Sequence, residues 1–113
     1  MIVLVYTGCS TCNKALAWLR AHGHTPTVRP IVAQPPTQAE LAQWIPRSGK
    51  PVRKWLNTSG QSYRALGKAK VDAASDADLA RWLGADGKLV KRPVLVTEAA
   101  VVVGFDEAAY AAL

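Results

Sequence analysis

The sequence lacks long hydrophobic runs and is sparing with cysteine. No stretch of about 18 consecutive apolar residues occurs, so the chain has no transmembrane helix of the usual kind. The apolar start has no basic region and no small-residue cleavage site, so we expect no signal peptide and a cytoplasmic location. Only two of 113 residues are cysteines, and structural disulfides are uncommon in that compartment. Half of the residues are apolar, which predicts one folded domain, residues 1–113.

Acidic residues are also few. Eight acidic residues face 14 basic ones, which gives a net charge of +6. A positive balance favours an anionic partner, such as a small oxyanion, an acidic protein surface or nucleic acid, although it can also serve solubility alone. The basic residues form no single run, which argues against direct nucleic-acid binding.

The order of patterns along the chain predicts a mixed α/β fold. Short β-branched runs at residues 2–6 and 25–31 flank a helical pattern over 10–22, which is typical of a βαβ unit. Two further runs, 94–96 and 101–103, are separated by four residues and predict a β-hairpin. Between these parts we expect helices over 37–45, 52–56, 62–67 and 75–83, the first stopping at Pro46, and a final helix over 106–113.

The strongest motif is the tetrapeptide Cys9-Ser10-Thr11-Cys12, which follows the first strand and opens a helix. A helix N-terminus presents free N–H groups and the positive end of the helix dipole, so it favours a thiolate, the reactive form of cysteine. Cys9 belongs to the turn and is expected to be exposed. Cys12 shares a helical face with Ala15 and Leu19, so we expect it to be buried. The spacing therefore predicts one attacking thiol and one resolving thiol.

Two other interpretations of the cysteine pair remain open. A zinc site would need further ligands, but His22 lies about 15 Å along the helix from Cys12, and no metal is expected. The two thiols could also be unrelated buried side chains. The adjacent βαβ pattern favours redox or nucleophilic chemistry over both.

Three segments together carry a family resemblance. The motifs YTGCSTCNKALAWL, NTSGQSYRALGK and KRPVLV, followed by VVVGF, resemble the arsenate reductase-like (ArsC) family, which includes Spx/MgsR-type transcription regulators. The resemblance covers almost the whole chain. It implies a thioredoxin-like fold, a mixed four-stranded sheet flanked by helices, with core residues 1–34 and 89–113 and a helical insert over about 35–88.

The resemblance also implies site residues. Cys9 matches the nucleophile of the family's arsenate reductases, and Arg92 matches one arginine that holds the oxyanion. Pro93 is at the point where thioredoxin-like folds have a cis-proline, which would hold Arg92 near Cys9; a surface arginine is the alternative. Cys12, absent from the glutaredoxin-linked enzymes, resembles the Spx-type switch.

Two further family arginines do not carry over, because their positions fall near Asn57 and Gly104. Candidate substitutes are Arg53, Lys14, Arg47 and Arg64. The substrate-binding set predicted from the sequence is Arg92, Asn13, Lys14, Arg53 and Asn57. Asn57 and its neighbours could donate hydrogen bonds to an oxyanion or simply cap the next helix.

Three functions follow from the resemblance. The first is arsenate reduction by Cys9 with Cys12 as the resolving thiol, without a bound cofactor, recycled by an external thiol reductant such as thioredoxin or glutaredoxin/glutathione. The second is an Spx/MgsR-type regulator that binds RNA polymerase. The third is general thiol–disulfide exchange. In each case we expect a monomer that is not attached to a membrane.

Overall fold

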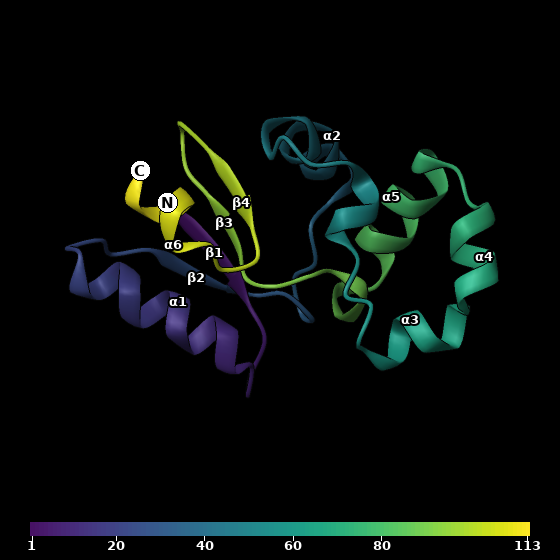
Figure 1. Cartoon of the computed structure of the whole chain (residues 1–113), viewed down its shortest axis with the longest axis horizontal. Coiled ribbons are helices and arrows are strands. Elements are labelled where there is room, and N and C mark those ends of the chain that lie inside the picture. Colours follow the sequence, from purple (N-terminus) through teal and green to yellow (C-terminus); the bar gives the residue numbers. More distant parts are fainter.

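Strand β1 (Ile2–Val5) lies inside a four-stranded mixed sheet and organises it. The computed structural model describes residues 1–113, and its strand order is β2-β1-β3-β4. β2 (Thr27–Pro30) pairs with β1 in parallel, while β3 (Val94–Val96) pairs with it antiparallel. β4 (Val101–Val103) completes the hairpin with β3. Helix α1 (Ser10–Ala21) connects the two parallel strands (Figure 1).

The sheet has a core on each face, because neighbouring residues of a strand point to opposite sides. On one face, Val3 and Leu95 pack with Ala15 and Leu19 of α1. Tyr110 of α6 (Glu107–Ala111) belongs to this cluster. On the other face, the neighbouring side chains of the strands belong to a larger cluster shared with the insert: Leu4, Val94, Val101, Val103, Trp55, Leu79 and Leu83. The insert is therefore packed on the sheet.

The insert consists of short helices at one end of the elongated molecule, which measures 42 × 27 × 24 Å (Figure 1). It contains α2 (Gln38–Arg47), the 3₁₀ turn η1 (Val52–Trp55), α3 (Gln61–Leu66), α4 (Lys68–Ala73), α5 (Asp76–Ala85) and the 3₁₀ turn η2 (Gly87–Leu89). This arrangement is the thioredoxin-like α/β fold that the resemblance implies.

Helix α2 begins as the sequence predicts and ends later. Thr37 accepts a hydrogen bond from the Glu40 N–H, and the Glu40 side chain accepts one from the Thr37 N–H, which completes a capping box. The expected stop at Pro46 is wrong, because α2 includes Pro46 and ends at Arg47. Proline there removes one hydrogen bond from the last turn only, which the helix tolerates.

Helix α4 is an element that the sequence analysis did not predict. It has only Val71 buried and lies directly after α3, from which Gly67 separates it at φ +86°. A six-residue helix with one buried side chain carries no readable apolar periodicity. The left-handed conformation of Gly67 explains the break between the two helices.

Candidate active site

Cys9 is the residue at which helix α1 begins. It adopts an extended conformation, with φ −81° and ψ 110°, and its Sγ accepts a hydrogen bond from the Cys12 N–H at 3.2 Å. The side chain is half-buried. The N-cap position therefore holds the Cys9 Sγ at the start of α1, within reach of the backbone N–H groups of the first turn.

Cys12 is in the opposite environment. Its side chain is 1% exposed and lies on the face of α1 that also carries Ala15 and Leu19. Burial, followed by the hydrogen bond with Cys9, raises the pKa of Cys12 to about 12. At neutral pH Cys12 is therefore a protonated thiol that solvent does not reach. The two thiols of one short motif therefore differ in their access to solvent.

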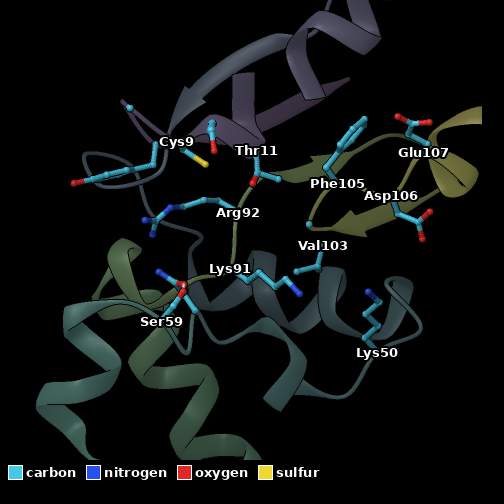
Figure 2. Close-up of a pocket in the computed structure, with 15 residues that line it drawn as sticks. Cys9, Thr11, Lys50, Ser59, Lys91, Arg92, Val103, Phe105, Asp106 and Glu107 are labelled. Atoms are coloured by element: carbon cyan, nitrogen blue, oxygen red, sulfur yellow. Dashed lines mark hydrogen bonds between the residues drawn. The ribbon is translucent and has the colours of Figure 1, made fainter. Parts of the chain in front are cut away.

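Two contacts hold the Arg92 side chain beside the cysteine loop, residues 6–12, which lead from the end of β1 into α1. Its Cζ lies 4.3 Å from the centroid of the Tyr6 ring, and its Nη1 donates to the Lys88 carbonyl at 3.3 Å. The bond between Arg92 and Pro93 is cis, and β3 begins directly afterwards. Figure 2 shows the Arg92 side chain beside Cys9. The charge of Arg92 acts in the direction of a lower pKa for Cys12, although burial outweighs it.

These groups open onto a cleft of about 870 Å³ between the sheet and the insert (Figure 2). The insert contributes Lys50, Asn57 and Ser59 to its wall. The remaining lining residues come from the segment between β1 and the first turn of α1, the segment before β3, and the end of β4 with the residues that follow it: Tyr6, Gly8, Cys9, Ser10, Thr11, Lys91, Arg92, Val103, Gly104, Phe105, Asp106 and Glu107. Cations and carboxylates are thus both present at the cleft.

The insert meets the site through main-chain hydrogen bonds. The Lys91 N–H donates to the Trp55 carbonyl at 2.7 Å, and the Asn57 N–H donates to the Leu89 carbonyl at 2.8 Å. The Asn57 side chain donates weakly to Lys88, at 3.5 Å, and accepts from the Ser59 hydroxyl at 3.2 Å. Residues around Asn57 are therefore fixed against the segment that leads into Arg92.

The structure brings some of the predicted site residues together and separates others. Cys9, Arg92 and Asn57 line the cleft, whereas Asn13 and Lys14 are exposed on α1 and do not line it. Arg53 is not a lining residue either. Its guanidinium donates to the carbonyls at residues 71 and 74, at 2.9 and 2.8 Å, and so covers the C-terminal end of α4.

The two other arginines considered as substitutes are also engaged elsewhere. Arg47 donates to the carbonyls of Thr97 and Glu98 in the β3–β4 turn. Arg64 donates to the Ser59 carbonyl at 3.0 Å, so its guanidinium lies close to a cleft residue without itself lining the cleft.

Sequence reasoning missed two cleft cations, Lys91 and Lys50. Neither forms an ion pair or a side-chain hydrogen bond. Lys91 passes over Gly104, where a Cβ would lie 3.2 Å from its Cε and 3.8 Å from its Nζ. Its position next to Arg92 was a usable signal, because both residues belong to the short segment that leads into β3. Lys50 carried no such signal.

The structure contains no cluster of metal-ligating side chains and no helix that could span a membrane. No three His, Cys, Asp or Glu side chains gather closely enough to hold a metal ion. His22 instead stacks on the Trp18 ring, with centroids 3.7 Å apart. None of the helices has the length and apolar character needed to cross a bilayer.

The fold, and the CxxC motif at the start of α1, define a protein of the thioredoxin-like class. Residues 4–113 match the model of the ArsC family, and the chain belongs to that family. At the family level, similarity to arsenate reductases supports a thiol-dependent oxidoreductase.

Individual relatives support this assignment. The chain is 40% identical over 103 residues to YusI of Bacillus subtilis, covering 90% of this chain and 87% of YusI. An ArsC family related protein from Bacteroides fragilis has a TM-score of 0.94 and 43% identity, covering 98% of this chain and 94% of that one. An arsenate reductase of Yersinia enterocolitica is 34% identical over 89 residues, covering 79% of this chain and 62% of the reductase.

The family also includes regulators. The global transcriptional regulator Spx of Bacillus subtilis is 27% identical over 108 residues, covering 94% of this chain and 82% of Spx.

Proposed function

We propose that this protein reduces arsenate, or an oxyanion of the same shape, with Cys9 as the nucleophile and Cys12 as the resolving thiol. The observation that carries the proposal is the contrast within the pair: Cys9 is accessible at the helix N-terminus, whereas Cys12 is buried and protonated, with its N–H bonded to the Cys9 Sγ. Such a pair divides attack and resolution between two thiols.

The reaction balances with these two thiols alone. The Cys9 thiolate attacks arsenic(V) and displaces one oxygen as water, which forms a sulfur–arsenic bond. Cys12 then loses its proton and attacks the Cys9 Sγ. The sulfur–arsenic bond breaks with its electron pair on arsenic, so arsenic(V) becomes arsenic(III) and a Cys9–Cys12 disulfide forms. An external thiol reductant of the thioredoxin type restores the dithiol in the cytoplasm by exchange.

In this proposal, the positive charges of Arg92 and Lys91 stabilise the negative charge of the oxyanion. Arg92 is positioned by Tyr6 and offers a planar fork of donors that suits tetrahedral oxyanions. Where the resemblance implies an arginine, near Gly104, the space is crossed by the Lys91 side chain. We infer that Lys91, from the segment before β3, supplies the positive charge that is missing at position 104, and that Asn57 adds a neutral donor.

A second candidate is thiol–disulfide exchange with a larger substrate. The cleft volume of about 870 Å³ favours it, because a single water occupies about 30 Å³ and an oxyanion only a few times that volume. Asp106 and Glu107 at the cleft would also be unfavourable neighbours for an oxyanion. Reduction of insulin, followed by turbidity, measures this activity directly.

The third candidate, a regulator of the Spx type that binds RNA polymerase, is favoured by sequence similarity rather than by the cleft. Capture of purified RNA polymerase by the oxidised protein, but not by the reduced protein, would support it. No capture in either redox state would remove it.

Single-turnover reduction is the decisive experiment for arsenate. The pre-reduced protein is mixed with arsenate without other thiols, and arsenite and protein mass are measured. We expect arsenite together with loss of two hydrogen atoms' mass, mapped to Cys9–Cys12. The Cys12→Ser variant should release no arsenite until an external thiol is added. Untouched arsenate with a fully reduced wild-type protein contradicts the proposal.

A further inference from the structure

Tyr110 carries a buried hydroxyl that has no part in the proposed reaction with arsenate. The residue is 1% exposed, and its hydroxyl has no hydrogen-bond partner. Burial of an unpaired donor is unfavourable, and a phenylalanine would fill much the same space without that cost. The hydroxyl therefore calls for an explanation beyond packing.

The surroundings of Tyr110 point to the cysteine helix. Its ring packs edge-on against Trp18 of α1 and against Phe105, with centroids 5.5 and 5.0 Å apart. It shares a core cluster with Ala15 and Leu19. Cys12 is three residues before Ala15 on the same buried face of α1. Phe105 also lines the cleft, so Tyr110 lies directly behind the site.

The electrostatics agree with this placement. Burial first, and then the charge of Cys12, raises the pKa of Tyr110 to about 12. No other ionisable group contributes to this shift. Tyr110 therefore keeps its proton at neutral pH and can act only as a neutral hydroxyl towards Cys12.

We propose that the Tyr110 hydroxyl is the hydrogen-bond donor that stabilises the Cys12 thiolate when the Cys9–Cys12 disulfide is opened. The thiolate of a reductant attacks the Cys9 Sγ and forms a mixed disulfide. The Cys9–Cys12 bond breaks, and its electron pair remains on the Cys12 Sγ. Tyr110 donates to that sulfur and keeps its proton. The Cys12 thiolate takes a proton when the second thiol of a dithiol reductant gives up its own to attack the mixed disulfide.

This role explains why the hydroxyl has no partner in the dithiol form. A protonated thiol is a weak acceptor, whereas a buried thiolate is a strong one. With its high pKa, Cys12 is a poor leaving group unless a donor meets the charge inside the protein. The inference rests on the proposed function, because it requires Cys9 and Cys12 to form a disulfide.

The test compares disulfide opening in wild type, Tyr110→Phe and a matched control, Tyr63→Phe. Tyr63 is a half-buried tyrosine of α3 in the insert, away from the cysteine loop. Each protein is oxidised with diamide, the Cys9–Cys12 bond is verified by mass spectrometry, and reduction by dithiothreitol is followed by rapid acid quench. We expect Tyr110→Phe to open about tenfold more slowly, as for loss of a hydrogen bond to a charged group, with stability to urea unchanged or higher.

The outcomes distinguish a failure of the Tyr110 inference from a failure of the proposed function. Equal opening rates for Tyr110→Phe and wild type overturn the inference and leave the proposed function intact. Equal slowing in Tyr63→Phe also overturns it, because the effect would then not be specific to Tyr110. A wild-type protein that forms no Cys9–Cys12 disulfide under diamide removes the proposed function itself.

A second measurement needs no variant. In the unaltered protein labelled at the tyrosine Cζ, the Tyr110 resonance should shift between the disulfide and dithiol forms more than the Tyr63 resonance does. Identical small shifts at both tyrosines would contradict a link between Tyr110 and Cys12.

Discussion

The N–H of Cys12 donates a hydrogen bond to the Sγ of Cys9 at 3.2 Å, so the buried cysteine supports the accessible one through its main chain. The two side chains differ in solvent access and, because the pKa of Cys12 is raised to about 12, in readiness to react. We predict that iodoacetamide modifies Cys9 in the native reduced protein at neutral pH at least about tenfold faster than Cys12. Peptide mapping after quenched alkylation measures both rates.

The control for this prediction is the unfolded protein. In urea the two thiols lose their different environments and should react at similar rates. Comparable labelling of the two cysteines in the native state would show that Cys12 is not protected in solution.

Arg92 provides the second prediction. Its guanidinium is fixed over Tyr6 and lies beside Cys9 (Figure 2). Replacement by methionine removes the charge, and we expect kcat/KM for arsenate to fall by roughly ten- to a hundredfold, as for loss of hydrogen bonds to a charged group. Arg92→Lys should recover only part of the activity because a lysine lacks the bidentate fork.

Arg20→Met is the matched control for Arg92. Arg20 is an exposed arginine near the end of α1 and lies outside the cleft, so the same loss of charge there should leave kcat/KM almost unchanged. An equal decrease in both variants would mean that overall charge, not the position of Arg92, attracts the oxyanion.

Lys91 provides the third prediction. Its side chain lies over Gly104 and has no ion-pair partner, so it is free to attract an anion into the cleft. In a Cys9→Ser background, which cannot react, Lys91→Met should weaken arsenate binding several-fold, and added salt should reduce the difference. Calorimetric titration at two salt concentrations measures both effects.

Lys54→Met serves as the control for Lys91, because Lys54 is also exposed but belongs to η1 and does not line the cleft. Unchanged affinity in Lys91→Met would remove Lys91 from the oxyanion site while leaving the thiol chemistry in place.

The order of elements could be predicted from the sequence because strong local signals mark it. The β-branched runs around Val3 and Val102 and the capping pair Thr37 and Glu40 depend only on neighbouring residues. Helix α4 could not be predicted because its stability comes from contacts made elsewhere, including the Arg53 guanidinium at its C-terminal end. Arg53 donates to the carbonyls of residues 71, 72 and 74, which lie 18 to 21 residues further along the chain. Local sequence patterns do not reveal contacts over such a separation.

The site residues likewise could be predicted where the signal is local and could not where it depends on long-range packing. The cysteine motif and the Arg92-Pro93 pair are adjacent in sequence to clear strand or helix boundaries, so both could be found. Lys50 could not, because it comes to the cleft only after the insert packs on the sheet. Arg53 has the right charge for an oxyanion, but charge alone does not reveal that main-chain carbonyls already occupy its donors.

The last prediction concerns the ion pair that joins the insert to the sheet. Arg29 of β2 donates to both carboxylate oxygens of Glu40 in α2, at 2.7 and 2.8 Å. The two side chains are 16% and 28% exposed, and the hydrogen bond from Arg29 lowers the pKa of Glu40. A carboxyl group with a lowered pKa in the folded state stabilises the fold above its unfolded pKa of about 4.3. This contribution is lost as pH falls through the folded pKa.

Glu40→Gln should therefore lower the free energy of unfolding by about 1–2 kcal/mol at neutral pH, a value reduced for partial exposure. The difference from wild type should shrink as pH falls below about 4, because Glu40 is then protonated as well. Urea unfolding at several pH values measures it. Asp78→Asn is the control, since its pair with Arg81 is solvent-exposed and should contribute little. A difference for Glu40→Gln that stays constant into acid would show that the amide disturbs packing rather than charge.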